Sequence, residues 1–557
     1  MYRKEPLVKL GNDFTNRSSW VESPRAWEKL LPQSIPKSVS YPEIPLHVLG
    51  RDAAERYPHN LAIYYIEDGR KYTYRELMYF SDKLARGLAD LGVKKGDGVG
   101  VYMGNSPEFI FSVYGISQVG GIVVPLNPLL SVTDIEYVIR DSGNIKTLIC
   151  DFQYYPSIES IVKKTGIERV LINGENPDGT LSLQNLIDES PADPPQVDFN
   201  PKEDPICLMY TGGTTGAPKG VVQTHFNICT NVLQMVTMEP TSPAEEGVVS
   251  CVTILPMCHT FGFSQTQLYI AQKAMMILFN GFDPPRIMSA IEMYKTENFV
   301  GIPLMFQVII NDPQFGNFDL SSLVRVVSGA APLPQDLVTR WKEAVGTDVG
   351  QGYGLSEACP SILMRPLWLK QKEGSIGIPL IDTDVKIVDP LNHEKTVPTG
   401  EVGEIVARGP QIMKGYWNRP EKTAEVLING WLHTGDLAYM DEEGYVYIAG
   451  RLSDMIKYKG YKVLPDDVED HLHKHPAILE CGVIGVPDKE IGETIKAFVV
   501  LKDAYKNKIT EQEIIDWSKE NMSGYKWPRI VEFIEALPRT AIGKIFRLKL
   551  REIKSQE

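Results

Sequence analysis

The sequence of 557 residues is 43% hydrophobic and 23% charged, a composition typical of globular proteins with more than one core. It excludes disordered and fibrous chains, and the length predicts two to four domains of roughly 100–200 residues each. The formal net charge of -14 argues against a nucleic-acid partner, because phosphate contacts need clustered Lys and Arg.

The sequence lacks signals for export, membrane insertion and disulfide pairing. Residues 1–19 contain no apolar signal-peptide core, and no apolar run of about 18 residues could span a membrane. We therefore expect no transmembrane segment and a cytoplasmic protein. The seven cysteines have no CxxC spacing and are expected to be small buried hydrophobic residues. His471, His473 and His475 lie in a predicted helix, where they fan out instead of converging on a metal.

Helix and strand signals alternate along the first third of the chain. Thr73 and Glu76 form a capping box, and apolar residues follow at helical spacing up to Leu91, after which Gly92 is predicted to end the helix. Such alternation is typical of βαβ units around largely parallel sheets. The next predicted elements are a strand at 98–103, helices at 107–119 and 133–140, and a strand at 146–150.

The pattern changes twice further along the chain. Residues 189–205 are rich in Pro and Asp and predict a loop, which leads into a strand at 206–210 and a second helix–strand series to about residue 349. From 374 to 406, short β-like segments predict an antiparallel or barrel-like piece. After a predicted turn at 450–454 we expect a helix at 465–475, strands at 480–486 and 495–501, and a helix at 511–520.

These elements predict an α/β protein of two domains. The N-terminal domain is expected to be large and multi-layered, with two βα sheets and a β-barrel-like piece, and the C-terminal domain to be small and α+β. We expect the boundary at residues 451–453, between a domain of residues 1–450 and a domain of residues 454–557.

The segment 210–220, YTGGTTGAPKG, has the composition of a phosphate-binding loop. It holds four glycines, three threonines and one lysine in eleven residues, directly after an apolar strand. Glycines let backbone N–H groups approach phosphate oxygens, threonine hydroxyls add donors, and Lys219 supplies mobile positive charge. It is not a Walker A loop, because Pro218 precedes the lysine and Gly220 follows it. A flexible Gly/Thr turn is the alternative interpretation.

This loop resembles the nucleotide-phosphate loop of the adenylate-forming superfamily, which comprises acyl-CoA synthetases, luciferases and the adenylation domains of peptide synthetases. The resemblance extends over about residues 45 to 550 and is closest to medium- and long-chain fatty acyl-CoA ligases and 4-coumarate-CoA-ligase-like enzymes. The further motifs occur in the expected order: LPMCH at 255–259, SGAAPL at 328–333, QGYGLSE at 351–357, GEI at 403–405, KGYWNRPE at 414–421, WLHTGD at 431–436, GR at 450–451 and LPRTAIGK at 537–544.

The resemblance implies an ATP site. Glu357 and Thr211 are implied to bind Mg²⁺, which prefers hard oxygen ligands, and Tyr353 to face the adenine. Taken singly, each of these residues would be an ordinary turn residue or helix-terminal charge. The implied ATP-binding residues are Thr211, Gly212, Gly213, Thr214, Thr215, Gly216, Lys219, Gly329, Ala330, Ala331, Gly352, Tyr353, Gly354, Leu355, Ser356, Asp436, Arg451 and Lys544.

The implied reaction is attack of a carboxylate on the α-phosphorus of ATP, which gives acyl-AMP and pyrophosphate, followed by transfer of the acyl group to CoA. A carboxylate is ionised at neutral pH and needs no general base, so positioning and charge stabilisation carry the first step. Asp436 and Arg451 are implied to bind the ribose. The implied catalytic residues are Lys544, Lys219, Glu357 and His259, and the implied cofactors and co-substrates are ATP, Mg²⁺ and CoA.

The segment 455–462 is implied to line the tunnel for the thiol of CoA. Lys457, Lys459 and Lys462 suit the phosphates of CoA, and Gly460 leaves room for pantetheine. A solvated Lys-rich strand is the alternative. In the superfamily the small domain rotates about a hinge between the two half-reactions. Ser453 occupies that hinge position, where Asp or Lys is usual, which leaves the balance between the two conformations open.

The sequence specifies the acid poorly. His259, Phe263, Ala330 and Gly354 are implied to line an apolar acyl pocket, which favours a medium- or long-chain fatty acid. Aromatic, short-chain and hydroxy acids stay open, as do a ligase that loads a carrier protein and a non-catalytic sensor of ATP or acid. His259 is expected to gate the pocket, with a core histidine as the alternative. The oligomeric state is also open, a homodimer included.

Overall fold

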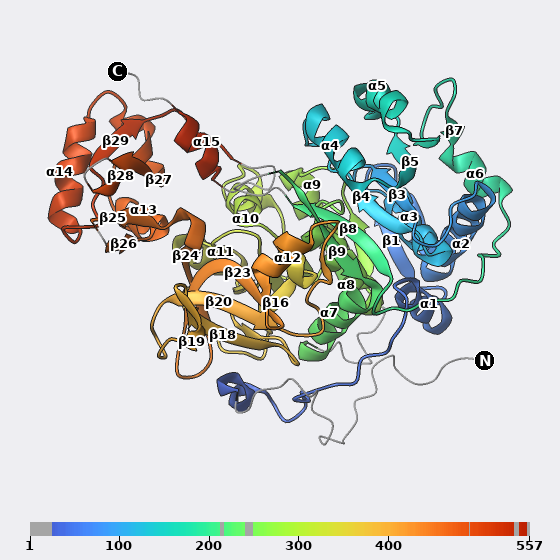
Figure 1. The fold of residues 1–557 in the computed structure, drawn as a ribbon, viewed down its shortest axis with the longest axis horizontal. Coiled ribbons are helices and arrows are strands. Elements are labelled where there is room, and N and C mark those ends of the chain that lie inside the picture. Colours follow the sequence, from blue (N-terminus) through green and yellow to red (C-terminus); the bar gives the residue numbers. More distant parts are fainter. Residues whose placement is uncertain are drawn as a thin grey trace. The chain divides into compact units, whose positions relative to one another are not determined.

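The computed structural model describes residues 25–211, 217–239, 249–459, 461–488, 491–539 and 545–553. Figure 1 shows the fold of these residues as a ribbon. Their contacts divide the chain into two compact units. The first unit comprises Met1–Asp384 and Ala407–Leu432, and the second comprises Val385–Val406 and His433–Glu557. The expected boundary at 451–453 stays a prediction. No described helix is long and apolar enough to cross a membrane.

The first unit contains an eight-stranded sheet in the order β21-β9-β8-β4-β3-β5-β6-β7. The strands from β8 to β7 run parallel, whereas β9 and β21 are antiparallel additions at one edge. Aliphatic side chains such as Val124, Leu148 and Leu208 form its core. The strands are β3 (Gly98–Tyr102), β4 (Ile122–Pro125), β5 (Ile145–Asp151), β6 (Arg169–Asn173), β7 (Leu181–Ser182), β8 (Pro205–Thr211), β9 (Lys219–Thr224) and β21 (Gly415–Tyr416).

A second sheet of the first unit has seven strands in the order β14-β13-β12-β10-β11-β1-β2. All pairs are parallel except the antiparallel edge pair of β1 and β2. Phe299, Phe306 and Trp341 lie in the core on this sheet. The strands are β1 (Leu61–Tyr65), β2 (Lys71–Thr73), β10 (Ser250–Thr253), β11 (Met275–Leu278), β12 (Asn298–Gly301), β13 (Arg325–Ser328) and β14 (Val349–Gln351).

Several helices of the first unit begin or end at local signals that the sequence provides. Thr73 and Glu76 form both bonds of a capping box at the start of α2, and Gly120 ends α3 in a left-handed conformation. Helices α1, α2 and α3 pack on one another, as do α7 and α8. The helices are α1 (His47–Arg56), α2 (Tyr74–Asp90), α3 (Pro107–Val119), α4 (Val132–Ser142), α5 (Tyr155–Thr165), α6 (Leu183–Glu189), α7 (His225–Met238), α8 (Thr260–Ala271), α9 (Pro284–Tyr294), α10 (Pro303–Ile310), α11 (Gln335–Val345) and α12 (Pro420–Val426), with the 3-10 helices η1 (Ala26–Leu30), η2 (Phe315–Asn317) and η3 (Ser356–Ala358).

Short antiparallel strands follow the second sheet, which confirms the antiparallel character expected from residue 374 onward. Strand β16 pairs with β15 and β17, and β18 pairs with β19. Strand β23 pairs with β22 and β24. The strands are β15 (Tyr353–Gly354), β16 (Ser361–Met364), β17 (Ile378–Pro379), β18 (Asp384–Asp389), β19 (Asn392–Thr396), β20 (Gly403–Arg408), β22 (Leu427–Ile428), β23 (Trp431–Met440) and β24 (Val446–Arg451).

The end of the chain forms an α+β layer, as expected. A five-stranded sheet has the order β26-β25-β28-β27, with β29 parallel to β28. Its core includes Val483, Ala497 and Ile514. The elements are η4 (Leu452–Asp454), β25 (Ile456–Tyr458), β26 (Tyr461–Val463), α13 (Pro465–Leu472), β27 (Ile478–Asp488), β28 (Gly492–Leu501), η5 (Asp503–Tyr505), α14 (Glu511–Asn521), β29 (Ile530–Phe533) and α15 (Arg547–Glu552).

Two predicted element ends are wrong. The predicted turn does not begin at Gly450, because β24 continues through Arg451, which pairs with Asp436 in β23. The helix predicted to reach His475 ends at Leu472. Pro476 follows His475 and disfavours a helical conformation for the residue before it.

Candidate functional site

The phosphate-loop segment joins two antiparallel strands. Thr211 at the end of β8 pairs with Lys219 at the start of β9, so the loop closes a hairpin. Gly212, Gly213, Thr214, Thr215 and Gly216 lie outside the described residues. The neighbouring Tyr210 hydroxyl donates to Asp141 Oδ2 at 2.9 Å, and burial together with this carboxylate raises the pKa of Tyr210.

Lys219 and Glu357 are linked through Tyr416. The ammonium of Lys219 lies 5.1 Å from the centroid of the Tyr416 ring, a cation–π distance. The hydroxyl of the same tyrosine donates to Glu357 Oε1 at 2.7 Å. Burial, and then the charge of Glu357, raises the pKa of Tyr416, so its hydroxyl stays a donor. One side chain therefore orients both a cation and a carboxylate.

The backbone around Glu357 is fixed from two sides. Gln223 in β9 donates its side-chain amide to the carbonyl of Ser356 at 2.8 Å. The amide of Met413 donates to the carbonyl of Glu357 at 2.8 Å. Strand β21, which carries Tyr416, pairs with β9, which carries Lys219. The carboxylate is thus bound from the strand that pairs with the loop-bearing hairpin, and the backbone before it is bound by the hairpin itself.

The predicted adenine segments lie next to each other at the carboxyl ends of parallel strands. Ser328 at the end of β13 pairs with Gln351 at the end of β14, and the amide of Gly352 donates to the carbonyl of Ser328 at 3.1 Å. This is the edge of a parallel sheet where ligands usually bind. Gly329, Ala330, Ala331, Tyr353, Gly354, Leu355 and Ser356 continue from these two strand ends.

The backbone is constrained at two positions in these segments, for different reasons. Ala330 has φ of 66°, in the left-handed region that L residues rarely adopt. A Cβ on Gly354 would lie 2.0 Å from the carbonyl oxygen of Pro360, closer than any contact that atoms tolerate. The backbone after β14 is therefore packed against the following strand, without space for a side chain.

His259 caps a helix. Its Nδ1 accepts the amide N–H of Phe261 at 3.3 Å at the start of α8. The ring of Phe261 packs on Gly329, where an added Cβ would lie 2.8 Å from it, and Phe263 is buried at 2% exposure. An apolar wall thus connects the predicted gate with the predicted adenine segment. A core histidine would donate a ring N–H to a backbone carbonyl. His259 Nδ1 does not do so, because it accepts a hydrogen bond here.

In the second unit, Asp436 and Arg451 form an ion pair. Arg451 Nε lies 2.8 Å from Asp436 Oδ1, and the two residues are direct partners of β23 and β24. The hydroxyl of Thr434 accepts the amide of Asp436 at 3.1 Å and donates to the carbonyl of Ile405 at 2.7 Å. Glu404 Oε1 accepts the amide of Gly435 at 3.0 Å. The turn before Asp436 is therefore fixed on both sides.

The predicted hinge residue Ser453 is exposed and lies in η4. Its neighbour Asp454 is buried and pairs with Arg547 and Arg551 of α15 at 3.5 and 3.4 Å. Arg547 also contacts Glu469 Oε2 at 2.8 Å. These ion pairs tie the segment after Ser453 into the second unit, while Ser453 itself stays a predicted hinge.

The predicted CoA and adenylation lysines are described only in part. Lys457 is exposed in β25, and Lys459 has φ of 49° with its ammonium 5.6 Å from the Tyr458 ring centroid. Gly460 and the side chain of Lys462 lie outside the described residues, as does Lys544. Arg539 and Ile545 bridge the ends of the segment that contains Lys544.

Sequence reasoning missed the roles of Tyr416 and Gln223. The sequence assigns no site residue to the KGYWNRPE segment, although its Tyr416 contacts the predicted catalytic residues Lys219 and Glu357. The signal available was an aromatic residue with a polar tip inside a matching motif.

All seven cysteines are free and buried, which confirms the expectation of small buried residues. Burial raises the pKa of every thiol, and that of Cys258, beside His259, to about 12.

The chain is similar to known enzymes over nearly its whole length. The AMP-binding enzyme family matches residues 50–417, and the AMP-binding enzyme C-terminal domain matches residues 467–544. A long-chain-fatty-acid–CoA ligase of Bacillus subtilis (strain 168) is 36% identical over 563 aligned positions, with 96% of this chain and 99% of the relative covered. A feruloyl-CoA synthase of an Amycolatopsis species is 37% identical, with 89% and 96% covered. The solved structure of an anthranilate CoA ligase in complex with anthranoyl-AMP has a TM-score of 0.81 at 30% identity, with 94% of this chain and 98% of that chain covered.

Proposed function

The chain belongs to the AMP-binding enzyme family, and on that premise we propose that it activates a medium- or long-chain fatty acid. The class of reaction is that of an AMP-forming acyl-CoA ligase, which uses ATP, Mg²⁺ and CoA. The choice of acid rests on the similarity to the long-chain-fatty-acid–CoA ligase, which is 36% identical to this chain and is covered over 99% of its length.

In the first half-reaction, a carboxylate oxygen bonds to the α-phosphorus of ATP while the bond from this phosphorus to the bridging oxygen breaks. Pyrophosphate leaves with the electron pair, and acyl-AMP remains. Lys219 and Lys544 would neutralise the negative charge that accumulates on the phosphates. The hard oxygens of Glu357 and Thr211 fit Mg²⁺, which would screen the phosphates. Tyr416 is a positioning residue that aims Lys219 and Glu357.

In the second half-reaction, the sulfur of CoA bonds to the acyl carbon, AMP leaves with the electron pair, and the thiol proton passes to solvent. Lys457 and Lys459 are proposed to bind CoA phosphates, a role that the exposure of Lys457 supports. Asp436 is proposed to accept hydrogen bonds from the ribose, with Arg451 holding its carboxylate at 2.8 Å.

The proposed acyl pocket begins at His259. Because His259 Nδ1 accepts a backbone N–H, a neutral ring carries its proton on Nε2. This geometry supports a gating or hydrogen-bonding role and not that of a general base. The Phe261 ring against Gly329 and the buried Phe263 provide the apolar surface that a hydrocarbon chain requires.

An aromatic acid is the second candidate, because the feruloyl-CoA synthase is 37% identical over 96% of its length. A flat ring and an alkyl chain place different demands on the same apolar wall. A rigid aromatic acid fits a short flat slot, whereas each added methylene of a fatty acid gains about 0.8 kcal/mol when it is buried.

The test is release of AMP by the full chain over saturated acids of increasing length and over ferulate and anthranilate, each with and without CoA. The fatty-acid proposal predicts that kcat/KM rises about two- to fourfold per methylene until the pocket is full. Higher kcat/KM for ferulate than for every fatty acid would overturn it and favour the second candidate.

A further inference from the structure

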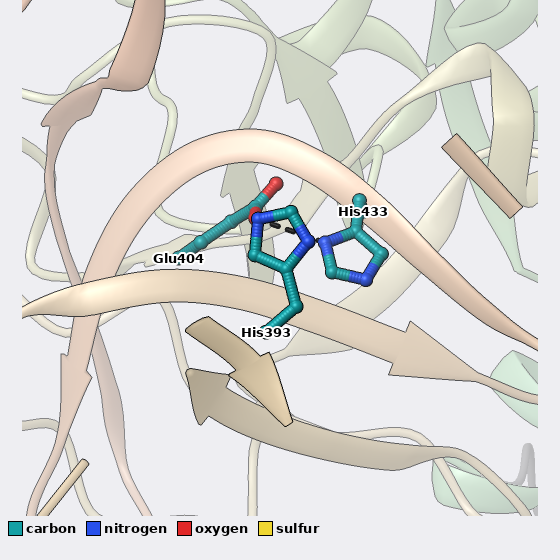
Figure 2. Close-up of side chains that lie close together, drawn as sticks. All are labelled: His393, Glu404 and His433. Atoms are coloured by element: carbon teal, nitrogen blue, oxygen red, sulfur yellow. Dashed lines mark hydrogen bonds and ion pairs between the residues drawn. The ribbon is translucent and has the colours of Figure 1, made fainter. Parts of the chain in front are cut away.

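Three potential metal ligands of the second unit, none of them assigned to ATP, lie close together. His393 belongs to β19, Glu404 to β20 and His433 to β23, and their side chains point toward one another (Figure 2). Their ligand atoms all lie within 4.8 Å of one another. Among the described residues this is the group of His, Cys, Asp and Glu side chains that is close enough to hold one ion.

The distances fit a shared ion. Glu404 Oε2 lies 2.9 Å from His433 Nδ1 and 3.8 Å from His393 Nε2. Ligands at about 2.0–2.2 Å from a tetrahedral Zn²⁺ lie roughly 3.3–3.6 Å from one another, between these two values. A small shift of the exposed His393 side chain, together with a slight separation of Glu404 Oε2 from His433 Nδ1, would bring all three atoms onto one ion.

Burial explains why a cation is favoured here. The side chain of Glu404 is 3% exposed and that of His433 is 8% exposed, whereas His393 is 40% exposed. A buried carboxylate needs a charged partner or a metal. In the described part of the chain, the groups within ion-pair distance of Glu404 are these two imidazoles, which carry a charge only when protonated. The exposed His393 leaves an approach from solvent, and water can complete the coordination.

The donor set also selects the kind of ion. Two imidazoles and one carboxylate suit Zn²⁺ and related transition metals, whereas Mg²⁺ prefers oxygen ligands. The other oxygen, Glu404 Oε1, accepts the amide of Gly435 at 3.0 Å, which fixes the orientation of the carboxylate. Such outer hydrogen bonds are a feature of metal sites.

We propose that His393, Glu404 and His433 bind one divalent transition-metal ion of the Zn²⁺ class. The simpler alternative is a hydrogen bond between His433 and Glu404 with His393 merely nearby. The alternative needs nothing from His393, whereas the metal site requires it. His393 is therefore the residue that separates the two.

The test measures Zn²⁺ binding to the metal-free full chain by competition with a chromophoric chelator. The buried thiols do not compete in the folded protein. We expect the parent to bind one Zn²⁺ per chain and to keep it in excess Mg²⁺. His393→Ala should bind Zn²⁺ at least about tenfold more weakly. All five residues of β19 are exposed, so this variant should fold. His59→Ala, which removes another exposed histidine, is the matched control and should bind like the parent.

Equal Zn²⁺ affinity of His393→Ala and the parent would overturn the proposal, as would displacement of the ion by Mg²⁺. Equal weakening by His59→Ala would also overturn it, because the loss would not be specific to the cluster. Acyl-CoA synthesis does not enter this measurement, so the result is independent of the proposed function.

Discussion

Tyr416→Phe tests whether one hydroxyl positions the predicted metal ligand. The substitution removes the O–H that donates to Glu357 Oε1 at 2.7 Å and keeps the ring that faces Lys219 at 5.1 Å. A hydrogen bond to a charged group contributes about 1.5–3 kcal/mol. Because each 1.4 kcal/mol is a factor of ten, we expect ATP–pyrophosphate exchange to fall about ten- to a hundredfold. The Mg²⁺ concentration for half-maximal exchange should rise, because Glu357 loses its fixed orientation.

The matched control for this variant is Tyr41→Phe. The Tyr41 hydroxyl donates to Asp382 Oδ2 at 2.8 Å, so the control removes a bond of the same chemistry elsewhere in the first unit. Both variants should lower the thermal unfolding temperature, but the control should keep the parent's exchange rate and Mg²⁺ dependence. The reasoning is refuted if Tyr416→Phe exchanges within twofold of the parent, or if the control loses as much activity.

Three further predictions address the ribose, the pH dependence and a glycine. Asp436→Asn should raise the KM for ATP in the exchange assay about tenfold through loss of a charge-assisted hydrogen bond, and an unchanged KM would exclude a ribose contact. His225 accepts the amide of Leu46 at 3.0 Å, and burial lowers the pKa of this histidine to about 3. The unfolded chain therefore binds more protons, and stability falls with decreasing pH from about 6.5 to 3, by up to about 1.4 kcal/mol per unit for this group. His225→Asn should flatten this part of the pH profile of the urea midpoint, and an unchanged profile would contradict the assignment. Gly354→Ala, whose Cβ would lie 2.0 Å from a carbonyl oxygen, should destabilise the protein by about 1–3 kcal/mol or more in thermal unfolding. Gly352→Ala should cost less, because its Cβ would lie 3.7 Å from the nearest carbonyl oxygen. Equal losses of stability in the two variants would refute this reasoning.

Elements with strong local signals could be predicted from the sequence. The capping box at Thr73 and the Pro–Gly bounds of 107–119 identify α2 and α3, because caps and terminal glycines act within a few residues. The prediction of a turn at Gly450 was wrong. Glycine favours turns locally, but here pairing with the distant strand β23 continues the strand.

The candidate site was predicted as a set of residue types, not as an arrangement. Motif resemblance identified Lys219 and Glu357, but their connection through Tyr416 requires contacts between distant residues, since even Tyr416 and Glu357 are 59 positions apart. The antiparallel pairing of β21 with β9 creates that connection, and the motif around Tyr416 marks the residue but not this pairing. The cluster of His393 with Glu404 and His433 was missed for the same reason, since the three residues belong to separate strands.

The burial of the cysteines has a consequence for chemoselectivity. Acyl-AMP is a mixed anhydride that acylates any thiolate within reach, and Cys258 is adjacent in sequence to the proposed gate. With its pKa at about 12, only about one in 10⁵ of its thiols is ionised at pH 7. In the proposed reaction the protein's own thiols are thus buried and protonated, and CoA supplies the reactive thiol.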